Sequence, residues 1–258
     1  MISRSLDRWL GRGEDLDADH TPEGVRERLS RPPEHSYLRD FVYGGIDGAV
    51  TTFAVVAGVA GANLGPGVVV VLGLANLVAD GFSMAVSNYL GTKADQERRT
   101  RARKTEEEHI DSFPEGEREE VRQLFAAKGF EGEDLERAVE VITSDRERWV
   151  ETMLSDELGF APDTGSAARA SLATFVAFLV VGALPLLSFL INLAFPGLIA
   201  DPFMASIVLT GIGFLLVGIL KARVVDQPLW RGGIETLLLG GVAAAVAFGI
   251  GVALQGVA

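Results

Sequence analysis

Cysteine is missing from the sequence, and only three of its 258 residues are histidine. Disulfide bonds and thiolate metal sites are therefore excluded, and any bound metal must use oxygen, nitrogen or thioether ligands. Basic residues are also few, 23 Lys and Arg against 35 Asp and Glu, which gives a net charge of −12. A nucleic-acid partner is not expected for so acidic a chain. The first twenty residues contain no apolar run, so we expect no signal peptide there.

Charge is missing from long stretches of the chain. Charged residues are concentrated in residues 1–40 and 91–169. A membrane-spanning helix needs about 20 mostly apolar residues, and five segments meet or approach this length without the alternation of a barrel strand. They are residues 41–62, 67–90, 171–194, 203–220 and 234–255. We therefore expect an all-α membrane protein with five transmembrane helices. The alternative, helices buried in a large soluble core, would have to bury five uncharged segments without lipid.

The same pattern predicts the domain organisation. It comprises an N-terminal tail (1–38), transmembrane helices 1 and 2 (39–92), an acidic helical insert (93–169) and transmembrane helices 3 to 5 (170–258). Basic residues gather before the first span, at the start of the insert and in the last loop, whereas the turn at 61–66 is uncharged. The excess of positive charge on cytoplasmic loops places the N-terminus and the insert in the cytoplasm and the C-terminus outside. In a prokaryote the membrane would be the plasma membrane.

Polar residues inside the first two spans need a separate explanation. Asp47 lies in the first span and Asp80 near the middle of the second. A carboxylate at the bilayer centre costs at least about 2.5 kcal/mol, so its default interpretation is functional; the alternative is a protonated Asp that hydrogen-bonds a neighbouring helix. Steps of four residues join Asn76, Asp80 and Met84 into one row, the membrane stripe. Amide, carboxylate and thioether groups suit a path for Fe²⁺ or Mn²⁺. For Met84 taken alone, packing against lipid or the core would be the simpler explanation.

The insert offers a second set of possible ligands on predicted helices. Glu106 and His109, and also Glu117 and Glu120, are three residues apart, and Met153 and Glu157 are four apart. Each pair can present two side chains from one helix face, as in di-iron helical bundles. The alternative is a solvated acidic surface. We call these six residues the insert cluster.

Several segments together resemble the vacuolar iron transporter family. They are "RDFVYGGIDGAVTTFAVVAGVAGAN", "ANLVADGFSMAVSNYLGTKADQE", "RWVETMLSDELGF" and "GALPLLSF". The resemblance runs from about residue 38 to the end and includes the order of two spans, an acidic insert and three spans. It implies a homodimer whose translocation path lies between the two first spans.

The resemblance also implies roles for individual residues. Asp47 and Met84 match pathway residues of the family, and Glu106, Glu117, Glu120, Met153 and Glu157 match ligands of its metal-binding insert. Three positions depart from the family pattern: Asn76 and His109 stand where Glu is common, and Leu154 replaces a second methionine. We hypothesise that Asp80 supplies the carboxylate missing at position 76.

The expected function is therefore export of Fe²⁺ or Mn²⁺ from the cytosol, driven by exchange with protons. The metal is the transported and insert-bound ion, and no prosthetic group is expected. One alternative is a membrane-anchored metal store or sensor, which would gain nothing from Asp47 and Asp80. Another is a di-iron enzyme, but the insert lacks the repeated Glu-x-x-His of that architecture. No nucleotide-binding motif is present, and an enzyme is not expected.

Overall fold

The computed structural model describes residues 20–30, 36–161 and 165–256, and these residues form helices without any β-strand. Residues 1–35 and 36–258 form separate units. Most of the predicted N-terminal tail lies outside the described residues. Its one described helix is α3, Pro22–Ser30.

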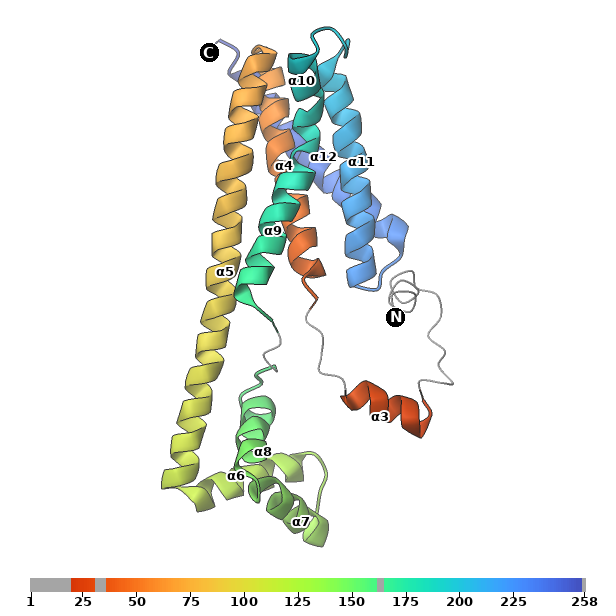
Figure 1. Ribbon diagram of the computed structural model, residues 1–258. Helices are drawn as coiled ribbons and strands as arrows, with labels where there is room; N and C mark the ends of the chain where they lie inside the picture. The colour runs from red at the N-terminus through yellow and green to blue at the C-terminus, as the bar shows by residue number, and fades with distance from the viewer. Residues whose placement is uncertain (1–19, 31–35, 162–164, 257–258) are drawn as a thin grey trace. The chain divides into compact units, whose positions relative to one another are not determined.

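Four helices of the second unit are long and apolar enough to cross a membrane. They are α4 (Leu38–Gly61), α5 (Pro66–Ser112), α11 (Pro202–Val224) and α12 (Leu229–Ala253) (Figure 1). Proline occupies the first turn of α5 and α11, where its missing N–H costs no hydrogen bond. Asp201 caps α11 by accepting a hydrogen bond from the Met204 N–H at 3.0 Å. These helices coincide with the predicted spans at 41–62, 67–90, 203–220 and 234–255.

The predicted span at 171–194 is a bent pair of helices instead of one straight helix. It consists of α9 (Ala167–Gly182) and α10 (Leu184–Ala194), which meet at an angle of 54°. Pro185 lies in the first turn of α10 and cannot donate the backbone hydrogen bond that would continue α9. The hydroxyl of Ser206 on α11 donates to the Pro185 carbonyl at 2.6 Å, so the bend is held by a neighbouring helix.

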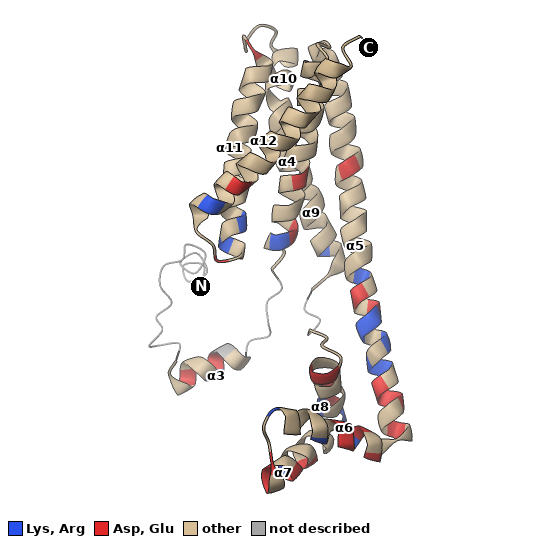
Figure 2. Cartoon of the chain, turned by 180° about the vertical axis from the view of Figure 1, so that it is seen from behind, with Lys and Arg blue, Asp and Glu red and all other residues tan. Residues whose placement is uncertain are grey.

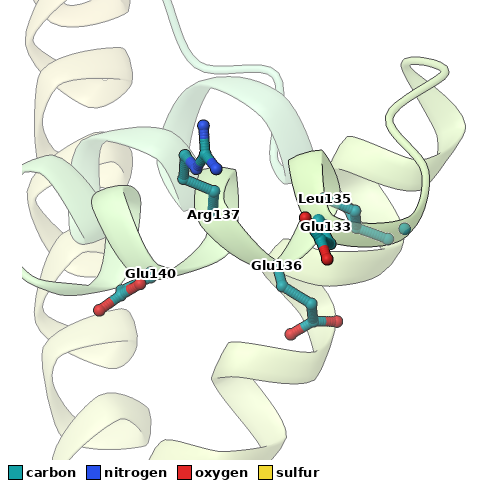
Figure 3. A pocket seen from close by; sticks show the side chains of 6 residues that line it. Glu133, Leu135, Glu136, Arg137 and Glu140 are labelled. Atoms are coloured by element: carbon teal, nitrogen blue, oxygen red, sulfur yellow. The ribbon is translucent and has the colours of Figure 1, made fainter.

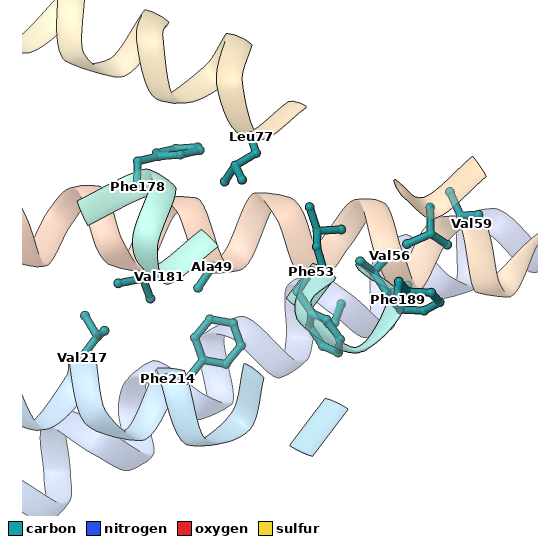
Figure 4. Close-up of a cluster of buried hydrophobic side chains, with 14 of the residues drawn as sticks. Ala49, Phe53, Val56, Val59, Leu77, Phe178, Val181, Phe189, Phe214 and Val217 are labelled. Atoms are coloured by element: carbon teal, nitrogen blue, oxygen red, sulfur yellow. The ribbon is translucent and has the colours of Figure 1, made fainter. Parts of the chain in front are cut away.

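The membrane helices pack around α4. Apolar side chains of α4, α5, α9, α10 and α11 meet in one cluster, which includes Phe53, Phe178 and Phe214 (Figure 4). Gly44 and Gly48, spaced as small residues at helix contacts in lipid usually are, bring α4 against α9. A Cβ at either position would overlap backbone atoms of Thr174 or Phe178. Glycine is therefore required for this close approach.

α5 continues without interruption from the apolar segment into the charged insert. It is a single helix of 47 residues, as the sequence predicts up to Pro114. Figure 2 shows charged residues along the C-terminal half of α5 and on the insert helices, while the other long helices have few. The insert helices are α6 (Pro114–Ala127), α7 (Gly132–Thr143), α8 (Arg146–Thr152) and the π-helix η1 (Met153–Glu157).

The insert has a small apolar core of its own. Val121, Val139, Val150, Met153 and Leu154 are at most 1% exposed and pack together. α6 ends just before Gly129, whose positive φ of 95° favours glycine. The segment "DRERWVETMLSDELG" is α-helical as far as Thr152, and from Met153 to Glu157 it forms one π-helical turn. The Leu158 N–H donates to the Met153 carbonyl at 3.1 Å, five residues back.

Candidate metal centre and membrane stripe

The insert cluster begins where α5 ends and the chain turns into α6. Glu106 and His109 lie on the last turns of α5, one helical turn apart. Phe113 separates the two helices, and Pro114 opens α6 in a position that needs no N–H. Glu117 follows in the first turn of α6, so the turn directs it back toward α5.

Three side chains of the cluster converge. Glu106, His109 and Glu117 each offer a ligand atom within 4.8 Å of the others, and His109 Nδ1 lies 3.4 Å from Glu117 Oε1. Glu106 and Glu117 are 5% and 4% exposed. Glu117 Oε2 is buried without a hydrogen-bond partner, which is costly for a carboxylate. A cation bound between these three residues would remove that cost.

The electrostatics of the cluster favour a cation in the same way. Burial, followed by repulsion from Glu120 and Glu106, raises the pKa of Glu117 to about 7. Burial also raises the pKa of Glu106, and desolvation with repulsion from Glu106 and Glu120 raises that of Glu157. Glu120 and Glu157 are therefore near enough to interact with the converging residues. Four mutually repelling carboxylates gathered at one place are typical of a functional site.

Met153 lies at the first residue of η1, which packs against both α5 and α6. Its side chain is fully buried in the insert core. Packing therefore explains its burial without a metal, and the structure gives no contact between its sulfur and the carboxylates. π-Helical turns are frequent at functional sites, and this one carries Met153 and Glu157 at its two ends.

A surface pocket of about 630 Å³ lies elsewhere, along α7. It is lined by Gly132, Glu133, Leu135, Glu136, Arg137 and Glu140. Figure 3 shows its charged side chains pointing in different directions from the helix, without converging on one point. None of the insert cluster contributes to it, so the pocket is not the candidate metal centre.

In the membrane helices, Asp47 and Asp80 are both exposed on the single chain. They lie on α4 and α5 and are near enough to interact electrostatically. Asn76 and Met84 are partly buried. Met84 packs against the apolar cluster around α4, whereas the Asn76 amide nitrogen is buried without a hydrogen-bond partner. The structure thus brings Asp47 close to the membrane stripe, with both carboxylates on the surface.

Asn88 continues the stripe in sequence but has structural partners. Its amide donates to Asp40 Oδ1 on α4 at 2.9 Å and to Thr174 Oγ1 on α9 at 2.7 Å. This contact ties three helices together near the ends of their apolar segments. No sequence pattern indicates this contact, because the three residues are far apart in the chain.

Sequence reasoning also missed two arginines of α5 beside the insert cluster. Arg99 and Arg103 bind glutamates of α8. The spacing of Arg103 and Glu107, four residues apart on one helix, was the only available sequence signal.

Comparisons with known proteins give consistent results. A sequence profile of the VIT family matches residues 38–252. The chain is 30% identical to vacuolar iron transporter 1 of Eucalyptus grandis over 84% of this chain and 86% of the relative. It is 30% identical to vacuolar iron transporter 1 of Arabidopsis thaliana, covering 82% and 83%. It is 32% identical to vacuolar iron transporter 2 of Oryza sativa subsp. japonica, covering 85% and 88%.

Proposed function

Because the chain belongs to the VIT family of metal transporters, we propose that it moves Fe²⁺, Mn²⁺ or both out of the cytosol in exchange for protons. Family membership makes it a multi-pass membrane transporter and not an enzyme. The direction of transport, the use of Mn²⁺ and the exchange for protons are parts of this proposal.

One observation carries the proposal: a single helix bears both sets of candidate ligands. α5 holds Asp80 and Met84 in its apolar half and Glu106 and His109 near its other end. In our proposal the insert cluster captures the metal from the cytosol and Asp47, Asp80 and Met84 conduct it through the membrane. The carboxylates would bind metal and protons alternately, because a metal ligand must lose its proton.

The arrangement of the spans follows the charge of the loops. We propose five transmembrane helices, with the bent pair α9 and α10 counted as one. The N-terminus and the insert would be cytoplasmic and the C-terminus extracytoplasmic. Lys221 and Arg223, in the last turn of α11, support a cytoplasmic loop before α12.

Exposure of the two intramembrane carboxylates supports a homodimer. On one chain Asp47 and Asp80 lie at the surface, where contact with lipid would be costly for either charge. A second copy placed against α4 would enclose both groups between the subunits. This matches the path between the two first spans that the family resemblance implies.

Transport into proteoliposomes tests the function. We expect the purified protein to take up Fe²⁺ or Mn²⁺, faster with a proton gradient of the appropriate direction. Asp47→Asn should lower the rate strongly, because it removes a pathway carboxylate. Glu133→Gln, on the exposed surface of α7, is the matched control and should transport as the original protein does.

A membrane-anchored metal store or sensor is the second candidate. It is favoured only by the insert cluster, which such a protein would also need. Metal binding without any uptake into vesicles would establish this alternative and overturn the proposed transport.

A further inference from the structure

Two arginines of α5 form a dense set of ion pairs beside the insert cluster. Arg99 Nη2 lies 2.6 Å from Glu151 Oε2. Arg103 Nη1 lies 2.8 Å from Glu151 Oε1 and its Nε 2.9 Å from Glu107 Oε1, and its Nη2 contacts Glu147. The side chains of Arg99 and Arg103 are 19% and 29% exposed. A planar guanidinium with several fixed donors suits such multiple contacts, whereas a lysine does not.

These ion pairs join the segments that carry the candidate ligands. Arg103 precedes Glu106 by three residues on α5, and Glu151 precedes Met153 by two residues on α8. α8 leads directly into η1, which carries Met153 and Glu157. The position of α8 on α5 therefore sets the distance between the ligands of α5 and those of η1.

The arginines also divide the carboxylates of this region into two groups. Glu107, Glu147 and Glu151 each pair with an arginine. In the described parts of the chain, no Lys or Arg nitrogen lies within 4.0 Å of the carboxylates of the insert cluster. Their one recorded ion-pair partner is His109, beside Glu117. Two positive charges thus offset most of the negative charge of the first group, whereas the second keeps its negative charge for a cation.

We propose that Arg99 and Arg103 are positioning residues of the insert's metal site. They hold α8 and η1 against α5 at the spacing the metal needs, and they withhold Glu107, Glu147 and Glu151 from competing for it. This inference rests on the proposed function of the insert cluster as a metal site. Without Arg103, Glu107, Glu147 and Glu151 would repel one another, and of these ion pairs only that of Arg99 with Glu151 would still hold α8 against α5.

The test uses the full-length protein in detergent, with Co²⁺ as a spectroscopic probe that does not oxidise in air. Replacing a residue that orients metal ligands typically lowers the metal affinity about 10- to 100-fold. We expect Arg103→Gln to weaken Co²⁺ binding about tenfold or more and to change the visible absorption of bound Co²⁺, which reports coordination geometry. Arg103→Lys keeps the positive charge but loses the planar guanidinium with its several donors. Its Co²⁺ affinity should lie between those of Arg103→Gln and the original protein.

Arg122 offers a matched control in the same insert. It also bridges two glutamates, Glu119 of α6 and Glu136 of α7, but α7 carries no candidate ligand. Arg122→Gln should leave the Co²⁺ spectrum unchanged. The charge-reversed pair Arg103→Glu with Glu147→Arg should recover part of the affinity that Arg103→Glu loses alone.

The outcomes separate this inference from the proposed function. If Arg103→Gln and Arg103→Lys bind Co²⁺ with the original affinity and spectrum, the positioning role is wrong while the metal site stands. An equal loss in Arg122→Gln would also overturn it, because general stability of the insert would then explain both losses. If the original protein binds no Co²⁺, the metal site itself is refuted, and this inference with it.

Discussion

The carboxylate of Glu117 is buried inside the insert, where Glu106 and Glu120 repel its charge. Its pKa of about 7 lies above the ordinary value of 4.5, so the folded, metal-free protein binds this proton more tightly than the unfolded chain does. The stability that this protonation contributes is full below about pH 4.5 and is lost as the pH rises through about 7. Metal binding has the opposite dependence, because the metal displaces the proton.

The first prediction follows from this competition. Co²⁺ affinity of the full-length protein should fall as the pH drops below about 7 and level off above it. Glu117→Gln should weaken binding roughly tenfold or more, since even outer residues of metal sites cost that much, and should flatten the pH dependence. Calorimetric titration at several pH values measures both effects. Unchanged affinity in Glu117→Gln would mean that the acidic face is merely solvated.

His109 brings a nitrogen donor into a cluster that otherwise offers carboxylates and one thioether. Imidazole suits Fe²⁺, Co²⁺ and Zn²⁺, whereas Mn²⁺ favours oxygen ligands. His109→Glu should therefore lower the ratio of Co²⁺ to Mn²⁺ affinity several-fold, chiefly by weakening Co²⁺. Competition between the two ions on the full-length protein measures the ratio. The same ratio in both proteins would show that His109 does not bind the metal.

Asp80 is predicted to serve as a relay for metal or protons in place of the carboxylate missing at Asn76. Asp80→Asn keeps the shape of the side chain and removes its charge. It should leave metal binding by the insert intact, lower transport and reduce the effect of a proton gradient. Asn76→Glu combined with Asp80→Ala should restore part of the rate, because the carboxylate moves one turn along the stripe. If Asp80→Asn transports metal at the same rate as the original protein, Asp80 is a structural hydrogen-bonding group.

At the scale of the helices, the contact between α4 and α9 depends on the absence of side-chain atoms at Gly48. Alanine normally favours a helix over glycine by about 1 kcal/mol. At Gly48 a Cβ would meet the backbone of Phe178, and such overpacking costs about 1–3 kcal/mol. Gly48→Ala should therefore lower the thermal unfolding temperature in detergent.

Gly241 of α12 is the matched control for this prediction. A Cβ there has no neighbour within 4 Å, so Gly241→Ala should leave the unfolding temperature unchanged or raise it. Equal effects of the two substitutions would show that the α4–α9 contact is not limiting for stability.

Long apolar runs and turn residues were sufficient to predict most helices of the fold. The length of α5 is consistent with the lack of any helix breaker before Pro114, and the end of α6 with Gly129. The bend before Pro185 was missed because membrane helices accommodate proline with or without a kink, depending on neighbours such as Ser206. The ion pairs of Arg103 with Glu147 and Glu151 depend on how α8 folds back on α5, which local sequence does not determine.

For the candidate site, the sequence indicated which residues pair on one helix but not how the pairs come together. Helical spacing identified Glu106 with His109 as one pair and Glu117 as part of another. Their convergence needs the turn at Phe113, and the burial of Glu117 needs the apolar core of the insert. Neither follows from spacing alone.

At the scale of the whole molecule, the proposed orientation makes a direct prediction. A reporter fused after Ala258 should be extracytoplasmic, and one inserted near Gly129 should be cytoplasmic, because basic loops stay inside. Enzymatic or fluorescent reporters of compartment measure this in intact cells. Both reporters on the same side would refute five spans with this orientation.

The uninterrupted length of α5 has a consequence for the ionic surroundings of the insert. At a rise of about 1.5 Å per residue, Glu106 lies roughly 24 Å along the helix from Leu90, the end of the predicted span. The field of charged lipid headgroups decays with a Debye length of about 8 Å at physiological ionic strength. Along the helix, that distance is about three such lengths. In the proposed orientation the insert would thus meet metal at its bulk cytosolic concentration, and its metal occupancy should not depend on the fraction of anionic lipid in the bilayer.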